Sequence, residues 1–247
     1  MPAAPLLLVT RPDPDGTATA AEIAARLPVE AIVSPVVERT DTGAVWQGPA
    51  PDGVILTSSA ALSTLAAQAL PSGLPAWCVG DRTAEAAERA GFAARSANGD
   101  ADALVALVTA ERPAGLLVHL RGENSRGDVA GRLRAAGLSA DDLVVYRQSA
   151  RPLTDAARAA LDGDAPVVAP LYSPFSARAL ADQGPFRAPL HLVAISEATA
   201  QAASGLPAES VAVAEVPSGT AMIRLIDATL RTLFPRGALL EGPPSTG

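Results

Sequence analysis

The feature that most constrains how this chain folds is a pattern that occurs twice along it. Residues 79–87 and residues 195–203 each end an apolar run and open an alanine-rich helical stretch, and 116 residues separate their first positions. An apolar run, a small or polar turn and a helical pattern in succession predict a strand, a tight turn and a helix. The backbone N–H groups at such helix starts point outward at the positive end of the helix dipole, where anions bind.

Three further matches occur in the same order along the two halves of the chain. Residues 7–11 match 117–121, residues 36–39 match 144–147, and residues 54–61 match 170–177. The offset drifts between 108 and 116 residues. Four ordered matches with a drifting offset indicate two divergent halves, each about as long as a small domain.

Strand and helix patterns alternate along both halves, which predicts an α/β fold with parallel sheets and helices on both faces. The patterns predict strands over residues 6–10, 29–33, 53–57, 76–79, 115–120, 143–147, 167–172, 190–195 and 211–214, and helices over 18–27, 59–70, 82–90, 101–110, 128–136, 154–161, 175–181, 197–203 and 218–233. Residues 40–52 have the composition of a linker, and the Pro/Gly-rich residues 235–247 that of a disordered tail. Ligands of open α/β sheets bind beyond the carboxyl ends of the strands, where every repeated turn lies.

Composition excludes several classes of protein. The formal net charge of −7 argues against a general nucleic-acid binder, whose affinity rests on neutralising phosphates. The single cysteine, Cys78, cannot form an internal disulfide, which fits a reducing compartment. The apolar run at residues 6–9 is too short for a signal peptide or a membrane span. We therefore expect a cytoplasmic protein without nucleic-acid or membrane partners.

Five motifs, in this order, resemble those of uroporphyrinogen-III synthases over residues 6–233. They are Thr-Ser-Ser-Ala at residues 57–60, Gly-Asp-Arg-Thr-Ala at 80–84, Val-Val-Tyr-Arg at 144–147, Tyr-Ser-Pro at 172–174 and Ser-Glu-Ala-Thr-Ala at 196–200. The resemblance implies two flavodoxin-like domains, in which each sequence half contributes to both: residues 1–38 with 150–247, and residues 40–148. Two linkers, near residues 36–40 and 147–153, would join them and act as a hinge. The repeat by itself leaves two tandem domains equally open.

The implied reaction is cyclisation of the linear tetrapyrrole hydroxymethylbilane to uroporphyrinogen III, in a cleft between the domains. Loss of the hydroxyl group as water gives an azafulvenium cation, which the far-end pyrrole attacks to form a spiro intermediate. That intermediate fragments and recloses with the terminal ring inverted. The resemblance implies a monomeric lyase that acts on an anionic tetrapyrrole and needs no cofactor or metal.

The candidate site residues lie at the turns that follow the strands. The resemblance places Tyr146 as the candidate acid and Thr199 as a second catalytic position. The candidate substrate-binding residues are Arg11, Thr57, Ser58, Ser59, Gly80, Arg82, Thr83, Ala84, Arg121, Gly122, Ser173, Pro174, Phe175, Ser176 and Ser196. The chain departs from the family at Ala60, where some members carry arginine. Ala60 cannot make the carboxylate contact of that arginine, so it is not a candidate site residue.

Each candidate also has a purely structural interpretation. Tyr146 can be a packed, hydrogen-bonded tyrosine at the end of a strand. Thr83 and Thr199 can stabilise the starts of their helices by local hydrogen bonds. Arg11 and Arg121 can be solvated or ion-paired.

Few other groups in the sequence indicate chemistry. His119, His191 and Cys78 lie inside apolar strands, where a buried structural role is commoner than metal ligation. No glycine-rich phosphate motif follows a strand, which counts against a dehydrogenase-like nucleotide enzyme. The remaining alternative is a non-catalytic two-domain binding protein or sensor for an anionic small molecule, because fold does not determine function.

Overall fold

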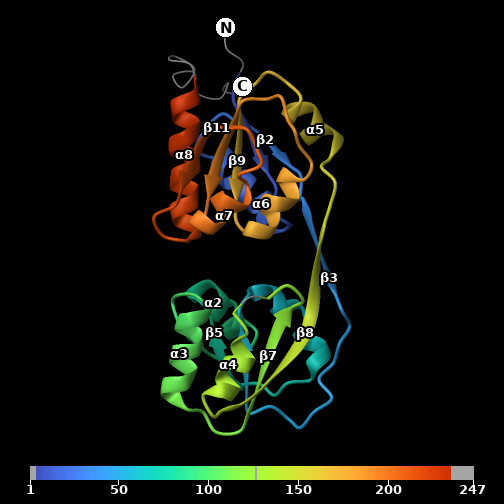
Figure 1. Ribbon diagram of the computed structural model, residues 1–247, viewed down its shortest axis with the longest axis vertical. Coiled ribbons are helices and arrows are strands. Elements are labelled where there is room, and N and C mark those ends of the chain that lie inside the picture. The colour runs from blue at the N-terminus through green and yellow to red at the C-terminus, as the bar shows by residue number, and fades with distance from the viewer. Residues whose placement is uncertain (1–3, 126, 235–247) are drawn as a thin grey trace, which may run out of the picture. The chain divides into compact units, whose positions relative to one another are not determined.

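The computed structural model describes residues 4–125 and 127–234, which form two compact units (Figure 1). Unit 1 combines Met1–Glu38 with Ser149–Gly247, and unit 2 is Arg39–Gln148. Each half of the sequence therefore contributes to both units, which is the arrangement that the resemblance implies, whereas two tandem domains would divide the chain only once. The tail expected at residues 235–247 lies outside the described residues.

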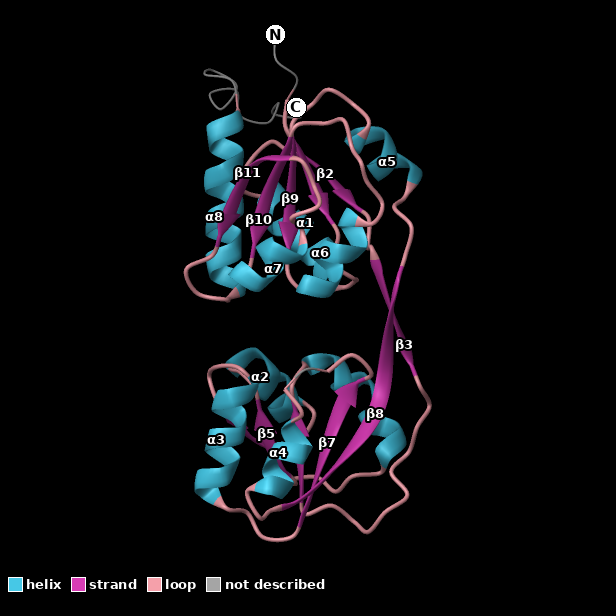
Figure 2. Cartoon of the chain, in the orientation of Figure 1, coloured by secondary structure: helices cyan, strands magenta, loops and turns pink. Residues whose placement is uncertain are grey.

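Unit 1 contains a five-stranded sheet in the order β11-β10-β9-β1-β2, and its paired strands are all parallel. The strands are β1 (Leu6–Val9), β2 (Glu30–Val33), β9 (Val167–Leu171), β10 (Leu190–Ala194) and β11 (Ala208–Val213). Helices cover both faces (Figure 2): α1 (Asp15–Ala24) and α8 (Gly219–Leu233) pack on one, and α5 (Asp155–Leu161), α6 (Pro174–Ala181) and α7 (Glu197–Ala202) on the other. Because successive strand residues face opposite ways, Leu7 and Val9 join one core and Leu8 the other.

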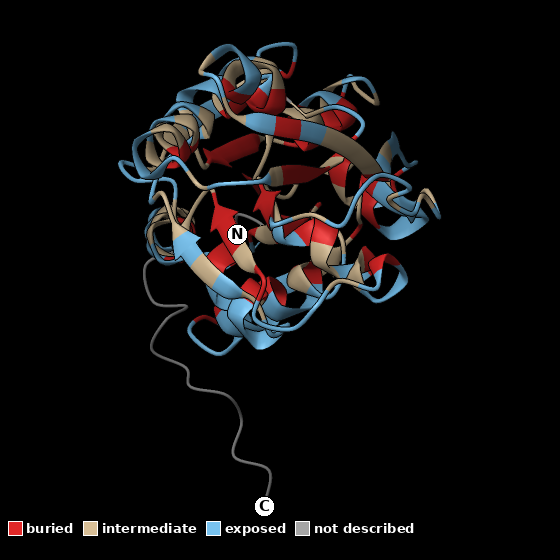
Figure 3. Ribbon diagram, turned by 90° about the horizontal axis from the view of Figure 1, so that it is seen from below, coloured by how far each residue is buried: buried red, intermediate tan, exposed pale blue. Residues whose placement is uncertain are grey.

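Unit 2 contains a six-stranded sheet in the order β3-β8-β7-β4-β5-β6. The strands are β3 (Val37–Asp41), β4 (Gly53–Leu56), β5 (Pro75–Cys78), β6 (Ala93–Ser96), β7 (Leu116–Gly122) and β8 (Ser139–Ala150). The 3₁₀ helix η1 (Ser59–Gln68) and α2 (Asp81–Arg89) cover one face, and α3 (Ala101–Glu111) and α4 (Val129–Ala135) cover the other. The apolar strands lie between these helical layers, so buried residues concentrate in the sheets (Figure 3).

The connections between the units run through the segments expected at residues 36–40 and 147–153, and most of these residues lie in strands, β3 and the end of β8. β3 and β8 are neighbours in the sheet of unit 2. The N–H of Thr42 donates to the carbonyl of Val145 at 3.0 Å, and the N–H of Arg151 donates to that of Val36 at 2.8 Å. Partner numbers that run in opposite directions mean an antiparallel pair, so this sheet is mixed. Pairing satisfies the backbone groups of both connections, and Val, Thr and Tyr favour extended structure.

The segment after β4 is a 3₁₀ helix where the sequence pattern predicts an α-helix over residues 59–70. The hydroxyls of Ser63 and Thr64 donate to the carbonyls of Ala60 and Ala61, three residues back, at 3.0 and 2.7 Å. Serine and threonine hydroxyls compete in this way with the longer-range bonds of an α-helix. The alanine content therefore predicted a helix but not its type.

Residues 40–52, expected to be a linker, belong to unit 2 and are attached to it at both ends and in the middle. The N–H groups of Thr42 and Asp52 donate to the carbonyls of Val145 and Leu116 at 3.0 and 2.8 Å, and the buried side chain of Gln68 holds the middle of the segment. Gln68 donates from Nε2 to the carbonyl of Ala44 at 2.6 Å and accepts at Oε1 from the N–H of Trp46 at 3.0 Å.

No helix among the described residues is long and apolar enough to cross a membrane.

Candidate functional site

The carboxyl ends of parallel strands bring the predicted residues together at one edge of each sheet. In unit 1, Arg11 follows β1, Ser173 follows β9 and Ser196 follows β10. In unit 2, Leu56 pairs with both Cys78 and Leu120, so the ends of β4 and β5 are level and β7 continues past them to Gly122. Thr57, Gly80 and Arg121 therefore lie at the same edge of the sheet.

Two helix starts in unit 1 have the same construction. Ser173 caps α6, and its Oγ accepts from the N–H of Ser176 at 3.1 Å and contacts the Ser176 hydroxyl at 2.9 Å. Ser196 caps α7, and its Oγ accepts from the N–H of Thr199 at 3.4 Å and contacts the Thr199 hydroxyl at 3.0 Å. Thr199 is fully buried, so in this structure its hydroxyl reaches the edge only through Ser196. Pro174 and Phe175, also expected at the site, form the first turn of α6.

Arg11 is held by its own unit. Its Nη2 lies 2.7 Å from the Asp15 carboxylate and its Nη1 lies 3.3 Å from the Thr19 hydroxyl. The guanidinium also stacks on the ring of Tyr172, 4.1 Å from the ring centre. Burial raises the pKa of the Tyr172 hydroxyl. Tyr172 was not among the candidates, although its position directly before Ser173 in the Tyr-Ser-Pro motif was an available signal.

The helix starts in unit 2 differ from each other. Ser58 caps η1 by accepting from the N–H of Ala60 at 3.1 Å. Gly80 caps α2 without a side chain, and its carbonyl accepts from the N–H groups of Thr83 and Ala84 at 3.0 and 3.1 Å. Thr83 and Ala84 are buried, whereas the two other candidates at these starts, Ser59 and Arg82, are exposed.

Tyr146 lies within β8 rather than at a strand end, because β8 continues to Ala150. It pairs with Gly122, the last residue of β7, after a shift in register beside Arg121. A Cβ atom on Gly122 would lie 2.6 Å from Cε2 and Cζ of Tyr146 and 2.9 Å from its Oη. The phenol ring therefore lies directly against the backbone of Gly122, and the buried glycine makes room for it.

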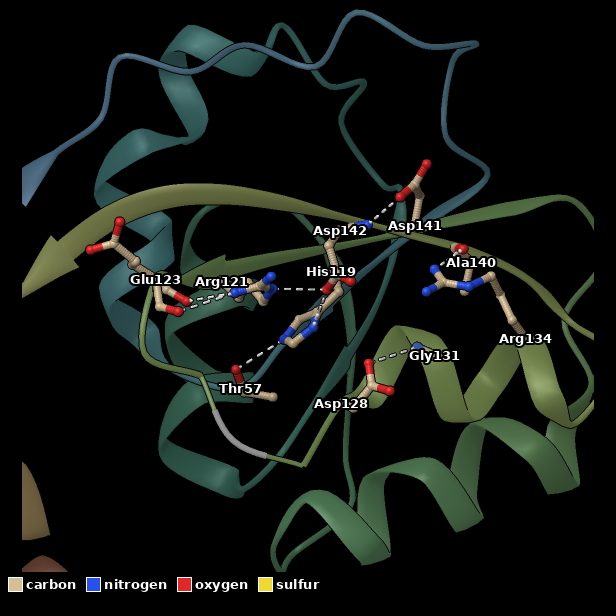
Figure 4. A network of polar contacts seen from close by, with 11 residues as sticks. Thr57, His119, Arg121, Glu123, Asp128, Gly131, Arg134, Ala140, Asp141 and Asp142 are labelled. Atoms are coloured by element: carbon tan, nitrogen blue, oxygen red, sulfur yellow. Dashed lines mark hydrogen bonds and ion pairs between the residues drawn. The ribbon is translucent and has the colours of Figure 1, made fainter.

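A partly buried polar network connects β7, β8 and the first residue after β4 (Figure 4). His119 contacts the Thr57 hydroxyl through Nε2 at 3.0 Å and the Asp142 carboxylate through Nδ1 at 3.1 Å. Nε of Arg121 donates to the same Asp142 oxygen at 3.0 Å, and its Nη1 donates to the carbonyl of Gly122 at 3.1 Å. The hydrogen bond from His119 lowers the pKa of Asp142, and the charge that His119 carries when protonated and the charge and hydrogen bond of Arg121 lower it further. Arg121 is thus ion-paired within its own unit.

His119 was predicted to be a core histidine, and Asp142 was not among the candidate site residues. His119 is indeed buried, with 1% of its surface exposed, but both of its ring nitrogens contact polar groups. The two residues are cross-strand neighbours. No sequence pattern reports that register. Within the described residues, no group of three or more His, Cys, Asp or Glu side chains is placed to hold a metal ion.

Together these features define a two-unit α/β protein whose sheets end in hydroxyl-rich turns suited to an anionic small molecule. The family model of uroporphyrinogen-III synthase HemD matches residues 18–224, and the chain belongs to this family. It is therefore a lyase that cyclises the tetrapyrrole hydroxymethylbilane to uroporphyrinogen III, which sets aside the alternative of a non-catalytic binding protein.

Two solved structures have the same fold. Uroporphyrinogen-III synthetase from Helicobacter pylori aligns with a TM-score of 0.66 at 16% identity, over 92% of this chain and 100% of that one. A mutant uroporphyrinogen III synthase from the extremely thermophilic bacterium Thermus thermophilus aligns with a TM-score of 0.54 at 15% identity, over 93% and 100%. No curated protein sequence matches the chain.

Proposed function

We propose that Tyr146 is the acid that helps the substrate hydroxyl leave, and that the carboxyl edges of both units bind the tetrapyrrole. The observation that supports this assignment is the position of the Tyr146 ring on Gly122, at the carboxyl end of β7. This contact holds the phenol beside the end of a strand, where ligands of such sheets bind. A positioned proton donor at this place meets the geometric requirement for general acid catalysis.

The first step breaks the bond between the hydroxymethyl carbon and its oxygen. The phenol O–H gives its proton to the departing hydroxyl, which leaves as water, and the pyrrole nitrogen stabilises the cation left behind. Ring closure later releases a proton from a pyrrole carbon, which restores the phenol. No net proton is consumed, so one residue can serve every turnover. Holding the two ends of the substrate together supplies the rest of the rate enhancement.

The substrate carries acetate and propionate groups, which need hydrogen-bond donors. We assign these contacts to the backbone N–H groups at the start of α2 and to the hydroxyls of Ser58, Ser173 and Ser196. Thr199 contributes by holding Ser196, since its own hydroxyl is buried. Arg11 and Arg121 add positive charge to their edges while Asp15 and Asp142 hold them in place.

The proposal also covers the compartment, the oligomeric state and the partners of the enzyme. The enzyme acts as a cytoplasmic monomer on a free anionic tetrapyrrole, with no nucleic-acid partner. The net charge of −7 supports the last point, since such a chain repels phosphate backbones. The single cysteine, which is buried and free, is compatible with a reducing compartment.

The decisive assay supplies freshly generated hydroxymethylbilane, oxidises the products and resolves the type I and type III isomers by chromatography. Wild type should form mainly type III. Tyr146→Phe should keep substrate binding and lose roughly 10²-fold or more in turnover, the usual range for a general acid. Unchanged turnover in Tyr146→Phe would contradict the assignment of the acid. Only type I product from wild type, at the rate without enzyme, would contradict the activity itself.

A further inference from the structure

One buried side chain at the carboxyl edge of unit 2 has no role in the mechanism above. His119 lies on β7 and connects two groups of different kinds, the Asp142 carboxylate on β8 and the hydroxyl of Thr57, the first residue after β4 (Figure 4). Thr57 is half-buried, and it alone of the three is a candidate for contact with the substrate. We refer to the three residues as the Thr57–His119–Asp142 chain.

The partners of Asp142 decide which ring nitrogen of His119 carries the hydrogen. An ionised carboxylate only accepts hydrogen bonds, so Nδ1 of His119 must be the donor at 3.1 Å. Arg121 already supplies a positive charge to the same oxygen, at 3.0 Å from Nε. In the neutral form of such a ring Nε2 is an acceptor. Thr57 Oγ1 then donates its hydrogen to Nε2 across 3.0 Å.

Once its hydrogen is directed to His119, the Thr57 hydroxyl can offer the substrate only lone pairs. We propose that His119 and Asp142 are positioning residues that make Thr57 a hydrogen-bond acceptor, and that Thr57 accepts from a pyrrole N–H of the tetrapyrrole rather than donating to a carboxylate. The proposal rests on the proposed binding of substrate at this edge. It separates Thr57 from Ser58, Ser173 and Ser196, to which we assign carboxylates.

Two substitutions of His119 separate its contacts. His119→Asn retains a polar atom near Nδ1 for Asp142 but does not reach Thr57, whereas His119→Gln reaches the position of Nε2. His119→Asn should lower kcat/KM about tenfold, the scale of one net hydrogen bond, and His119→Gln should recover most of it. In a Thr57→Val background, His119→Asn should cost nothing more, because the hydroxyl that it positions is gone.

A histidine of the other unit provides the matched control. His191 also lies inside a strand, and its Nδ1 contacts the Ser210 hydroxyl at 2.8 Å. It lies at the amino end of β10, at the opposite edge of its sheet from the candidate residues. His191→Asn should leave kcat and KM unchanged. Thermal unfolding of every variant shows whether a loss of activity reflects unfolding.

The tautomer can be read directly from wild type by nitrogen-15 NMR of the imidazole rings. The chain has only two histidines, so the spectrum of His191→Asn assigns the signals of His119. We expect a neutral ring protonated at Nδ1, and loss of this preference in Asp142→Asn. A charged ring, or one protonated at Nε2, would overturn the proposal, since Thr57 would then donate to the substrate. Additive costs of His119→Asn and Thr57→Val would also overturn it.

These outcomes are distinct from a failure of the proposed function. Unchanged turnover in Tyr146→Phe would remove the assigned acid and leave the Thr57–His119–Asp142 chain intact. Absence of type III product from wild type would show that hydroxymethylbilane is not the substrate, and the proposed contact between Thr57 and a pyrrole N–H would fall with it. A wrong tautomer alongside normal type III formation would overturn the positioning role alone.

Discussion

Gly122→Ala is the substitution whose effect the structure defines most sharply. Gly122 is buried at the end of β7, and an added Cβ would lie 2.6 Å from two ring carbons of Tyr146 and 2.9 Å from its hydroxyl oxygen. Carbon atoms in contact prefer about 3.5–4.0 Å, so the ring has to move by roughly 1 Å. The methyl group therefore displaces the proposed acid without changing its chemistry.

The displacement should affect stability and turnover to different degrees. Overpacking in a core typically costs about 1–3 kcal/mol, and the half-buried ring of Tyr146 favours the lower end of that range. A misplacement of about 1 Å at a reacting group can cost roughly 10²-fold in rate. We therefore expect a fall of several degrees in melting temperature and a loss of between about tenfold and about 10²-fold in type III formation.

Two comparisons isolate the cause. Gly219→Ala adds the same methyl group at the start of α8, where nothing lies within 4 Å. It should lower neither the melting temperature nor the rate of type III formation. In a Tyr146→Ala background, Gly122→Ala should have little further effect, because the ring it displaces is absent. Wild-type turnover in Gly122→Ala, or an equal cost of the substitution with and without the ring, would show that displacement of Tyr146 is not the cause.

Four further predictions concern stability and reactivity. Burial raises the pKa of the Cys78 thiol to about 12, so a thiol reagent at pH about 8 should label the protein only after unfolding, and rapid labelling of folded protein would contradict this. Ser218 caps α8 by accepting from a backbone N–H at 3.2 Å, so Ser218→Ala should lower the free energy of unfolding by about 1 kcal/mol in denaturant titrations without changing turnover. Gln68→Ala should cost about 1–3 kcal/mol by removing two hydrogen bonds to the backbone of half-buried residues, and protease cleavage within residues 40–52 should become faster. The pKa of Asp142 is lowered from its ordinary value of 3.8, so its ionised carboxylate stabilises the fold fully above pH 3.8. This contribution is lost as the pH falls from 3.8 through the lowered pKa of the folded state. The free energy of unfolding should therefore depend less steeply on pH across that range in Asp142→Asn than in wild type.

Local features of the sequence predicted most helices and strands. Asp100 precedes an apolar helical pattern, and in the structure its carboxylate accepts from the N–H groups of Asp102 and Ala103 at the start of α3. Ser173 and Ser196 cap α6 and α7 at the repeated positions. Capping and periodicity act within a few residues, so one sequence is enough to recognise them.

Long-range pairing is where sequence interpretation was insufficient. Residues 143–147 were predicted as a short strand, but β8 has 12 residues because β7 pairs with it from Ser139 onward and β3 provides a partner for its second half. The contacts of His119 with Thr57 and Asp142 join positions 62 and 23 residues apart. Each depends on the register between strands, which the period of a single strand does not contain.

The alternation of strands and helices, the repeat and the edge at which the polar turns collect could be predicted from the sequence, because they follow from hydrophobic period, caps and the direction of parallel strands. Tertiary structure decided which side chains meet at that edge. Tyr146 lies on Gly122, and His119 lies between Thr57 and Asp142, only because β7 pairs with β4 and β8 in one particular register. A shift of one residue would turn His119 to the other face of the sheet, so burial of the apolar neighbours on β7 holds the polar network in place.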